Sequence, residues 1–209
     1  MSTIPDNRRV LVIDDNPAIH DDFRKVLTDA GASAGMDAAE AALFGDATPA
    51  APRVSFELSY ASQGLEGVEK IAAARAAGTP FAMAFVDVRM PPGWDGIETI
   101  ARLWQADPHL HCVICTAYSD YSWEEMVSKL GRNDRLLILK KPFDNVEVSQ
   151  LVVALTEKWT LARQVRSQMR NMESLVGERT VQLERSVALT QATLDSSADG
   201  ILVVNQEGR

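Results

Sequence analysis

Four sites on this sequence place polar residues at the ends of apolar runs, and together they could carry phosphoryl chemistry. They are Asp14 and Asp15 after "RRVLVI", Asp87 in "FAMAFVDV", Thr116 after "LHCVIC", and Lys141 after "RLLILK". Crowded carboxylates repel one another unless a hard divalent cation lies among them, and Mg²⁺ fits oxygen ligands best. A metal-held carboxylate beside a hydroxyl and an ammonium group can attack a phosphoryl group. Asp87 is therefore a candidate nucleophile.

Alternating strand and helix patterns predict how these residues come together. Short apolar runs predict five strands, at 8–15, 54–61, 81–88, 110–116 and 135–140. Helical spacing predicts helices after them, at 16–31, 64–78, 95–108, 121–131 and from about 144 onward. This alternation is typical of an α/β fold with a doubly wound five-stranded parallel sheet. In such a sheet the ligand crevice lies outside the carboxyl ends of the strands, where the polar positions would meet.

Four stretches, in order, resemble the signatures of the response regulator receiver domain of two-component signalling. They are "VLVIDDNP", "AFVDVRMPPGWDG", "CTAY" and "KKPF". The resemblance runs from residue 8 to about 155 and implies a receiver domain over 1–150, with a flavodoxin-like sheet of strand order 2-1-3-4-5. It implies that Asp87 accepts phosphate from a partner histidine kinase or phosphotransfer protein. Thr116 would bond the phosphoryl oxygen in the active state, and Lys141 would pair with it.

The same resemblance implies a set of metal ligands. Asp14, Asp15 and Asp87 would hold Mg²⁺, with Asp15 the more direct ligand of the first pair. The backbone carbonyl of Arg89 would add a further oxygen. Pro142 would orient the preceding lysine through a cis peptide bond.

Three features depart from the usual receiver pattern. The loop from Asp87 to Gly96 is one residue longer than usual, and Asp95 within it is expected to cap the following helix. Ile138 occupies the position where many receivers carry a switching aromatic residue. An insertion over about 31–53 lengthens the first crossover and is either a solvated connection or a partner contact.

Beyond residue 150 the helical pattern continues without proline. Apolar residues from 155 to 194 largely follow a three-four spacing, which Arg179 interrupts in the seam. This pattern predicts a signalling helix over 151–194 that forms a homodimeric parallel coiled coil through 155–194. The alternative is a helix packed back on its own receiver. Residues 195–209 resemble the start of a truncated PAS domain.

Composition limits the remaining choices. Residues 1–150 hold 22 acidic and 14 basic residues, and 151–209 hold 7 of each, so neither part predicts a nucleic-acid surface. No apolar run reaches the length of a membrane span, and the first residues lack a signal-peptide core, which favours a cytoplasmic protein. Cys112 and Cys115 lie in one apolar strand, facing opposite sides, and are expected to be buried thiols.

The sequence favours a regulatory phosphoacceptor whose output lies in a C-terminal domain beyond this chain, such as PAS with a cyclic-di-GMP enzyme or a sensor kinase. Whether the chain is itself an enzyme stays open. One alternative is an aspartyl-phosphate phosphatase or phosphotransferase, although such enzymes usually need a second aspartate where Arg89 stands. Another is a dimerisation module that is never phosphorylated.

Overall fold

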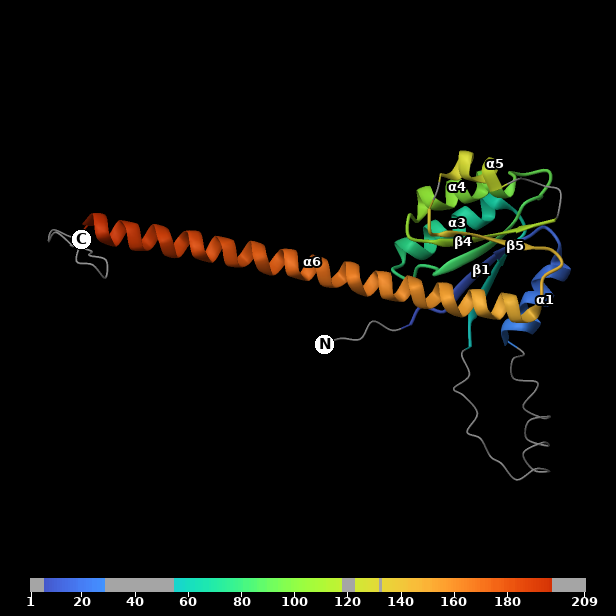
Figure 1. Cartoon of the computed structure of the whole chain (residues 1–209), viewed down its shortest axis with the longest axis horizontal. Coiled ribbons are helices and arrows are strands. Elements are labelled where there is room, and N and C mark those ends of the chain that lie inside the picture. Colours follow the sequence, from blue (N-terminus) through green and yellow to red (C-terminus); the bar gives the residue numbers. More distant parts are fainter. Residues whose placement is uncertain (1–5, 29–54, 118–122, 132, 197–209) are drawn as a thin grey trace, which may run out of the picture. The chain divides into compact units, whose positions relative to one another are not determined.

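A computed structural model describes residues 6–28, 55–117, 123–131 and 133–196 of the chain, and its centre is a parallel sheet. The strands are β1 (Arg9–Ile13), β2 (Glu57–Ala61), β3 (Met83–Asp87), β4 (His111–Thr116) and β5 (Leu136–Lys140). The helices are α1 (Pro17–Thr28), α3 (Gly64–Ala76), α4 (Gly96–Ala106), α5 (Trp123–Leu130) and α6 (Asn145–Ser196). Figure 1 shows these elements in chain order. The insertion at 31–53 and the PAS-like stretch from 197 onward lie outside the described residues.

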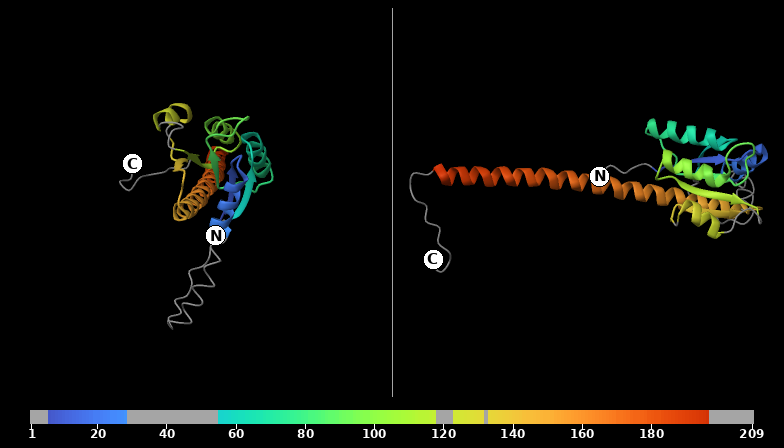
Figure 2. Two further views of the ribbon diagram at one scale, coloured as in Figure 1. Left: turned by 90° about the vertical axis from the view of Figure 1, so that its right-hand side faces the viewer. Right: turned by 90° about the horizontal axis from the view of Figure 1, so that it is seen from above.

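The strand order is β2-β1-β3-β4-β5, and all neighbouring strands are parallel. This confirms the predicted doubly wound α/β fold with order 2-1-3-4-5. Because every connection is a crossover, helices cover both faces of the sheet, as the end-on view of Figure 2 shows. The central strand β3 is buried along its length apart from its last residue, Asp87, which explains why its sequence is continuously apolar.

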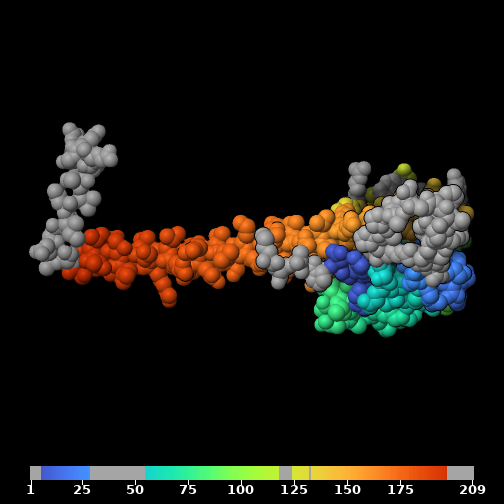
Figure 3. All heavy atoms as spheres, turned by 90° about the horizontal axis from the view of Figure 1, so that it is seen from below, coloured from blue at the N-terminus to red at the C-terminus, as the bar shows by residue number. Residues whose placement is uncertain are grey.

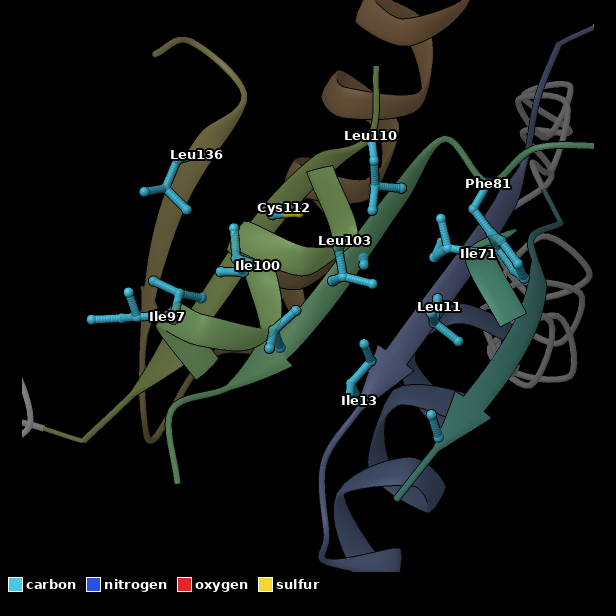
Figure 4. Packing of buried hydrophobic residues seen from close by; sticks show 14 of the residues in the cluster. Leu11, Ile13, Ile71, Phe81, Ile97, Ile100, Leu103, Leu110, Cys112 and Leu136 are labelled. Atoms are coloured by element: carbon cyan, nitrogen blue, oxygen red, sulfur yellow. The ribbon is translucent and has the colours of Figure 1, made fainter. Parts of the chain in front are cut away.

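Two hydrophobic clusters fix the helices to the sheet. One face packs against α3, α4 and α5, through residues that include Ile71, Ile100 and Met126. Figure 4 shows this packing, with Leu11 and Ile13 of β1 and Leu103 of α4 among the labelled side chains. The other face packs against α1 and the first turns of α6.

The two cysteines lie in different clusters, as the alternation of side chains along a strand predicts. Cys112 belongs to the cluster under α4, and Cys115 to the cluster under α1 and α6. Both are free and fully buried, and this burial raises the pKa of both thiols. The prediction of buried thiols is confirmed.

Helix α6 changes its role along its length. Val152, Leu155 and Trp159 are buried, and the first compact unit of the chain ends at Ala162. From Val165 onward the large apolar side chains of the helix are mostly exposed. The start of the predicted 155–194 seam therefore packs on the parallel sheet of its own chain, as the alternative interpretation proposed, and the exposed stripe begins near residue 165. None of the helices in the described ranges combines the length and the hydropathy needed to cross a membrane.

Candidate functional site

The centre of the site is an ammonium group between two carboxylates. Lys141 Nζ lies 2.8 Å from Asp14 Oδ2 and 2.6 Å from Asp87 Oδ1. The side chains of the two aspartates are only 4% and 13% exposed, so the lysine offsets charges that water hardly reaches. The structure thus brings together three predicted site residues from the ends of β1, β3 and β5.

Backbone hydrogen bonds beyond the strand ends hold these residues at one edge of the sheet. The Asp14 N–H donates to the Ala61 carbonyl, and the Lys141 N–H donates to the Thr116 carbonyl at 2.8 Å. The Val88 N–H donates to the Cys115 carbonyl. The ladder therefore continues past the strands, and the side chains of the site rest on a paired backbone. The Lys141–Pro142 peptide is cis, as the resemblance implied.

Each aspartate also accepts a bond from a backbone N–H two residues later. The Asn16 N–H donates to Asp14 Oδ1 at 2.9 Å, and the Arg89 N–H donates to Asp87 Oδ2 at 2.9 Å. With the lysine contacts, all four carboxylate oxygens have a donor. Hydrogen bonds of this kind fix the orientation of a carboxylate.

Electrostatics keep the lysine charged. Burial alone would lower the pKa of Lys141, but its hydrogen bonds to Asp14 and Asp87 outweigh burial, and its pKa is raised above the ordinary value. The site therefore carries a fixed positive charge at neutral pH, within reach of the carboxylate that would react.

Thr116 and Asp15 are placed differently from Asp14, Asp87 and Lys141. Thr116 is buried at the end of β4, where its hydroxyl donates to the Ala117 carbonyl at 2.9 Å. Asp15 is exposed. The described residues contain no group of three aspartate, glutamate, histidine or cysteine side chains gathered closely enough to hold a metal ion. The three predicted carboxylate ligands thus do not converge in this arrangement.

The oxygen atoms of the site nevertheless suit Mg²⁺. Asp14 and Asp87 present hard oxygen atoms, and each carboxylate oxygen has one recorded donor, which leaves it a lone pair. Asp15 lies next in the chain and is open to solvent, as is Arg89. These residues fit a magnesium site in which most ligands are water or carboxylate oxygen.

The long loop after β3 is anchored at two points. Gln63 Nε2 donates to the Pro91 carbonyl at 3.4 Å, and the Arg102 guanidinium lies 3.9 Å from the centroid of the Trp94 ring. Asp95 caps α4 by accepting from the Glu98 N–H at 2.7 Å, which confirms the predicted cap. The Gln63 contact could not be predicted from the sequence, because Gln63 lies 28 residues from its partner in the chain and belongs to no motif.

Gly96 is required where α4 begins. A Cβ atom at this position would lie 2.4 Å from the carbonyl oxygen of Asp87 and 2.9 Å from Val88 Cα. These are backbone atoms of the strand end that carries the candidate nucleophile, so they cannot move aside without moving the site. Gly177 in α6 provides a contrast, because no atom lies within 4 Å of its Cβ position.

We expect Gly96→Ala to cost about 2 kcal/mol of unfolding free energy, since overpacking against fixed backbone is destabilising. Gly177→Ala should instead leave stability unchanged or raise it by about 0.5–1 kcal/mol, because alanine favours helix over glycine. Urea denaturation of both variants measures the difference. Equal stability of the two variants would show that the start of α4 can relax away from β3.

Residues 50–153 match the family model described as the response regulator receiver domain. The match begins after β1, so Asp14 lies outside it although β1 lies between β2 and β3 in the sheet. No curated protein matches the sequence.

Several solved structures share the fold. One, the crystal structure of adenylate cyclase from Rhodopirellula baltica, is 18% identical with a TM-score of 0.56, and the alignment covers 78% of this chain and 98% of that chain. A signal receiver domain of an HD domain-containing protein from Pseudomonas fluorescens Pf-5 is 15% identical with a TM-score of 0.55. That alignment covers 78% of this chain and 97% of the Pseudomonas chain. A response regulator receiver domain protein from Methanospirillum hungatei JF-1 is 19% identical with a TM-score of 0.51. That alignment covers 73% of this chain and 95% of the Methanospirillum chain.

Proposed function

Because this chain contains a response regulator receiver domain, we propose that it is the phosphoacceptor of a two-component system and that Asp87 is the phosphorylated residue. The observation that carries the proposal is the Lys141 bridge between Asp14 and Asp87 at the carboxyl edge of the sheet. The donor is a phosphohistidine of a partner histidine kinase or phosphotransfer protein.

In the proposed reaction a carboxylate oxygen of Asp87 attacks phosphorus. The new O–P bond replaces the P–N bond of the donor, and the electron pair of that bond returns to the imidazole. Lys141 remains charged and balances the negative charge of the transferred group, while the Arg89 N–H steadies the carboxylate through its second oxygen. The Thr116 hydroxyl would turn from the Ala117 carbonyl toward the phosphoryl oxygen.

Mg²⁺ is part of this proposal. When bound, the ion would neutralise charge on the phosphoryl oxygens and reduce repulsion between carboxylates. Asp14, Asp15 and Asp87, with the Arg89 carbonyl, are the residues of this chain that would hold it.

We also propose that the second part of α6 joins two copies of the chain and passes the state of Asp87 to a C-terminal output domain. The exposed apolar side chains after residue 165 support this step. A PAS domain with a cyclic-di-GMP enzyme or a sensor kinase is the proposed output, and a cytoplasmic setting follows from the proposed partners.

The site disfavours two alternative functions. An aspartyl-phosphate phosphatase or phosphotransferase would release phosphate with turnover, and Arg89, exposed two residues after Asp87, disfavours it because such enzymes use an acid there. A dimerisation module that is never phosphorylated would have no use for a charged, partly buried lysine between two carboxylates.

Acetyl phosphate tests all three. We expect the chain to take up about one phosphoryl group in the presence of Mg²⁺, to lose this uptake with a chelator, and to lose it in Asp87→Asn. Asp22→Asn, a change at an exposed aspartate of α1, is the control and should be labelled normally. Many turnovers of phosphate release would favour the enzyme, and absence of labelling with Mg²⁺ would favour the dimerisation module.

A further inference from the structure

The amide of Gln63 lies against the loop after β3, although Gln63 comes from the end of β2. Its Nε2 atom donates to the Pro91 carbonyl at 3.4 Å. Its Oε1 atom is buried and accepts no hydrogen bond from the residues that the structure describes. A buried acceptor without a donor costs free energy, so packing as well as hydrogen bonding must keep this amide in place.

Gly93 packs directly on this amide. A Cβ atom at Gly93 would lie 2.2 Å from Gln63 Oε1, closer than non-bonded atoms approach each other. The glycine is not needed for its backbone conformation, since the described glycines with positive φ are Gly78 and Gly131. The Gly93 N–H donates to the Met90 carbonyl at 3.0 Å and closes a turn. Gly93 therefore lets this turn rest on the Gln63 side chain.

Gln63 projects from a rigid base. Its carbonyl accepts from the Gly67 N–H at 3.1 Å in the first turn of α3. A Cβ atom at Gly64 would lie 2.2 Å from Thr99 Oγ1 of α4, and one at Gly67 would lie 2.4 Å from Ile13 Cδ1 of β1. The start of α3 is thus wedged between β1 and α4. Figure 3 shows α3, in teal, lying beside β2, in cyan.

The start of α3 does not use the Gln63 side chain. Gln63 is the N-cap residue of α3, but its side chain makes no capping hydrogen bond. Glu66 reaches back instead, and its Oε2 atom accepts from the Ser62 N–H at 2.9 Å. A glutamate in the first turn commonly satisfies a free backbone donor in this way. The amide of Gln63 therefore serves the loop and not the helix.

The loop carries this support to the phosphoacceptor. Arg89 lies between Val88, whose carbonyl accepts from the Gly96 N–H at 2.9 Å, and the turn that starts at Met90. The Arg89 N–H holds Asp87 Oδ2 at 2.9 Å, and its carbonyl is one of the proposed oxygen ligands of Mg²⁺. Peptide units are planar and rotate only about φ and ψ, so a shift of the turn rotates the peptides of Arg89.

From these contacts we infer that Gln63 is a positioning residue for the phosphoacceptor. By holding Pro91 and Gly93, it sets the peptides on either side of Arg89, and with them the oxygen that this loop offers to Mg²⁺. The inference rests on the proposed function and adds a residue that acts on the metal site without contacting it.

Removal of the amide tests the inference on the full chain. Amide NMR spectra, recorded first without metal and then in a titration with Mg²⁺ alone, follow the signal of Arg89. Gln63→Ala should shift this signal in the metal-free chain and raise the dissociation constant for Mg²⁺ about tenfold, since residues that orient metal ligands contribute roughly 10–100-fold to affinity. Gln105→Ala, at an exposed glutamine of α4, is the control and should match the parent.

Gly93→Ala displaces the same amide without changing Gln63. The new Cβ atom takes the place of Oε1, so the Gln63 side chain must turn away from the Pro91 carbonyl. This variant should therefore reproduce both effects of Gln63→Ala, and the double variant should bind Mg²⁺ no more weakly than Gln63→Ala alone. Gly177→Ala is the control for the added methyl group. Losses that add up in the double variant overturn the shared contact.

A role in stability alone gives a different result. Variants that lose unfolding free energy but keep the Arg89 signal and the Mg²⁺ affinity of the parent overturn the inference. Gln63→Ala and Gly93→Ala change different segments of the chain, so either one decides if the other fails to fold.

Labelling by acetyl phosphate separates this inference from the proposed function. The variants should approach the labelling rate of the parent at saturating Mg²⁺ and need about tenfold more Mg²⁺ to reach half of it. Normal labelling with an unchanged Mg²⁺ dependence contradicts the role of Gln63 alone. A parent that is not labelled contradicts the proposed phosphoacceptor, and the Arg89 signal of the metal-free chain then still decides whether Gln63 sets that peptide.

Discussion

Lys141→Met is expected to lower the free energy of unfolding by about 3 kcal/mol at pH 7 without Mg²⁺, because removing one member of a buried ion pair leaves the other uncompensated. Here the lysine compensates two carboxylates, Asp14 and Asp87, both almost closed to solvent. Methionine keeps the length of the side chain and removes only its charge. Labelling by acetyl phosphate should fall sharply in the same variant, since the charge that balances the phosphoryl group is gone.

A second substitution identifies the cause of the loss. Asp87→Asn in the Lys141→Met background should recover part of the stability, because one of the two stranded charges is removed. In the parent, Asp87→Asn should change stability far less, since Lys141 keeps its contact with Asp14. Lys25→Met is the control: Lys25 and Asp22 form an exposed pair 3.6 Å apart, and such pairs contribute little. Additive effects of the two changes at the site would contradict a shared charge cluster.

The contacts of Lys141 with Asp14 and Asp87 stabilise the folded chain over a definite range of pH. The pKa of Lys141 is raised in the folded chain, so its contribution to stability is complete below the ordinary lysine pKa of 10.5. The contribution is lost as the pH rises beyond that value through the folded pKa. The difference in unfolding free energy between the parent and Lys141→Met should therefore be constant across neutral pH and shrink only in strong base.

The sequence predicted the framework of this site well for a physical reason. Strands buried on both faces must be apolar, so a polar residue at the end of such a run is conspicuous, and parallel connections bring those ends to one edge. Asp87 and Lys141 were found in this way. The same reasoning could not predict which of Asp14 and Asp15 contacts the lysine. Neighbouring residues of a strand point to opposite sides, and only the fold decides on which side Lys141 lies.

Two other features were hidden from the sequence. The apolar residues of α6 look alike at Leu155 and Val165, yet the first is 3% exposed and the second 53% exposed. Periodicity reports which side of a helix is apolar and does not tell what covers it. The anchoring of the loop after β3 depends on Gln63 and Arg102, which come from other elements and carry no motif.

The largest expected response to pH comes from the opposite edge of the sheet. His111 is the first residue of β4, it is 3% exposed, and its Nδ1 atom is buried without a hydrogen-bond partner among the described residues. Burial, aided by the positive charges of Lys158 and Arg135, lowers the pKa of His111 to about 4, against a weaker opposing effect of Asp134. The folded chain therefore holds this imidazole neutral.

A histidine whose pKa is depressed by folding stabilises the folded state fully above its unfolded pKa of about 6.5 and loses that contribution as the pH falls toward the folded value. We expect the parent to lose about 3 kcal/mol of stability between pH 6.5 and pH 4 from this one group. His111→Gln cannot take up the proton, so its stability should be flatter over this interval, even if it is lower at pH 7. His109→Gln, at an exposed histidine two residues earlier, is the control and should keep the pH dependence of the parent. Urea denaturation at half-unit steps of pH measures the three curves, and parallel curves for the parent and His111→Gln would show that the imidazole reaches solvent or a proton acceptor in the folded chain.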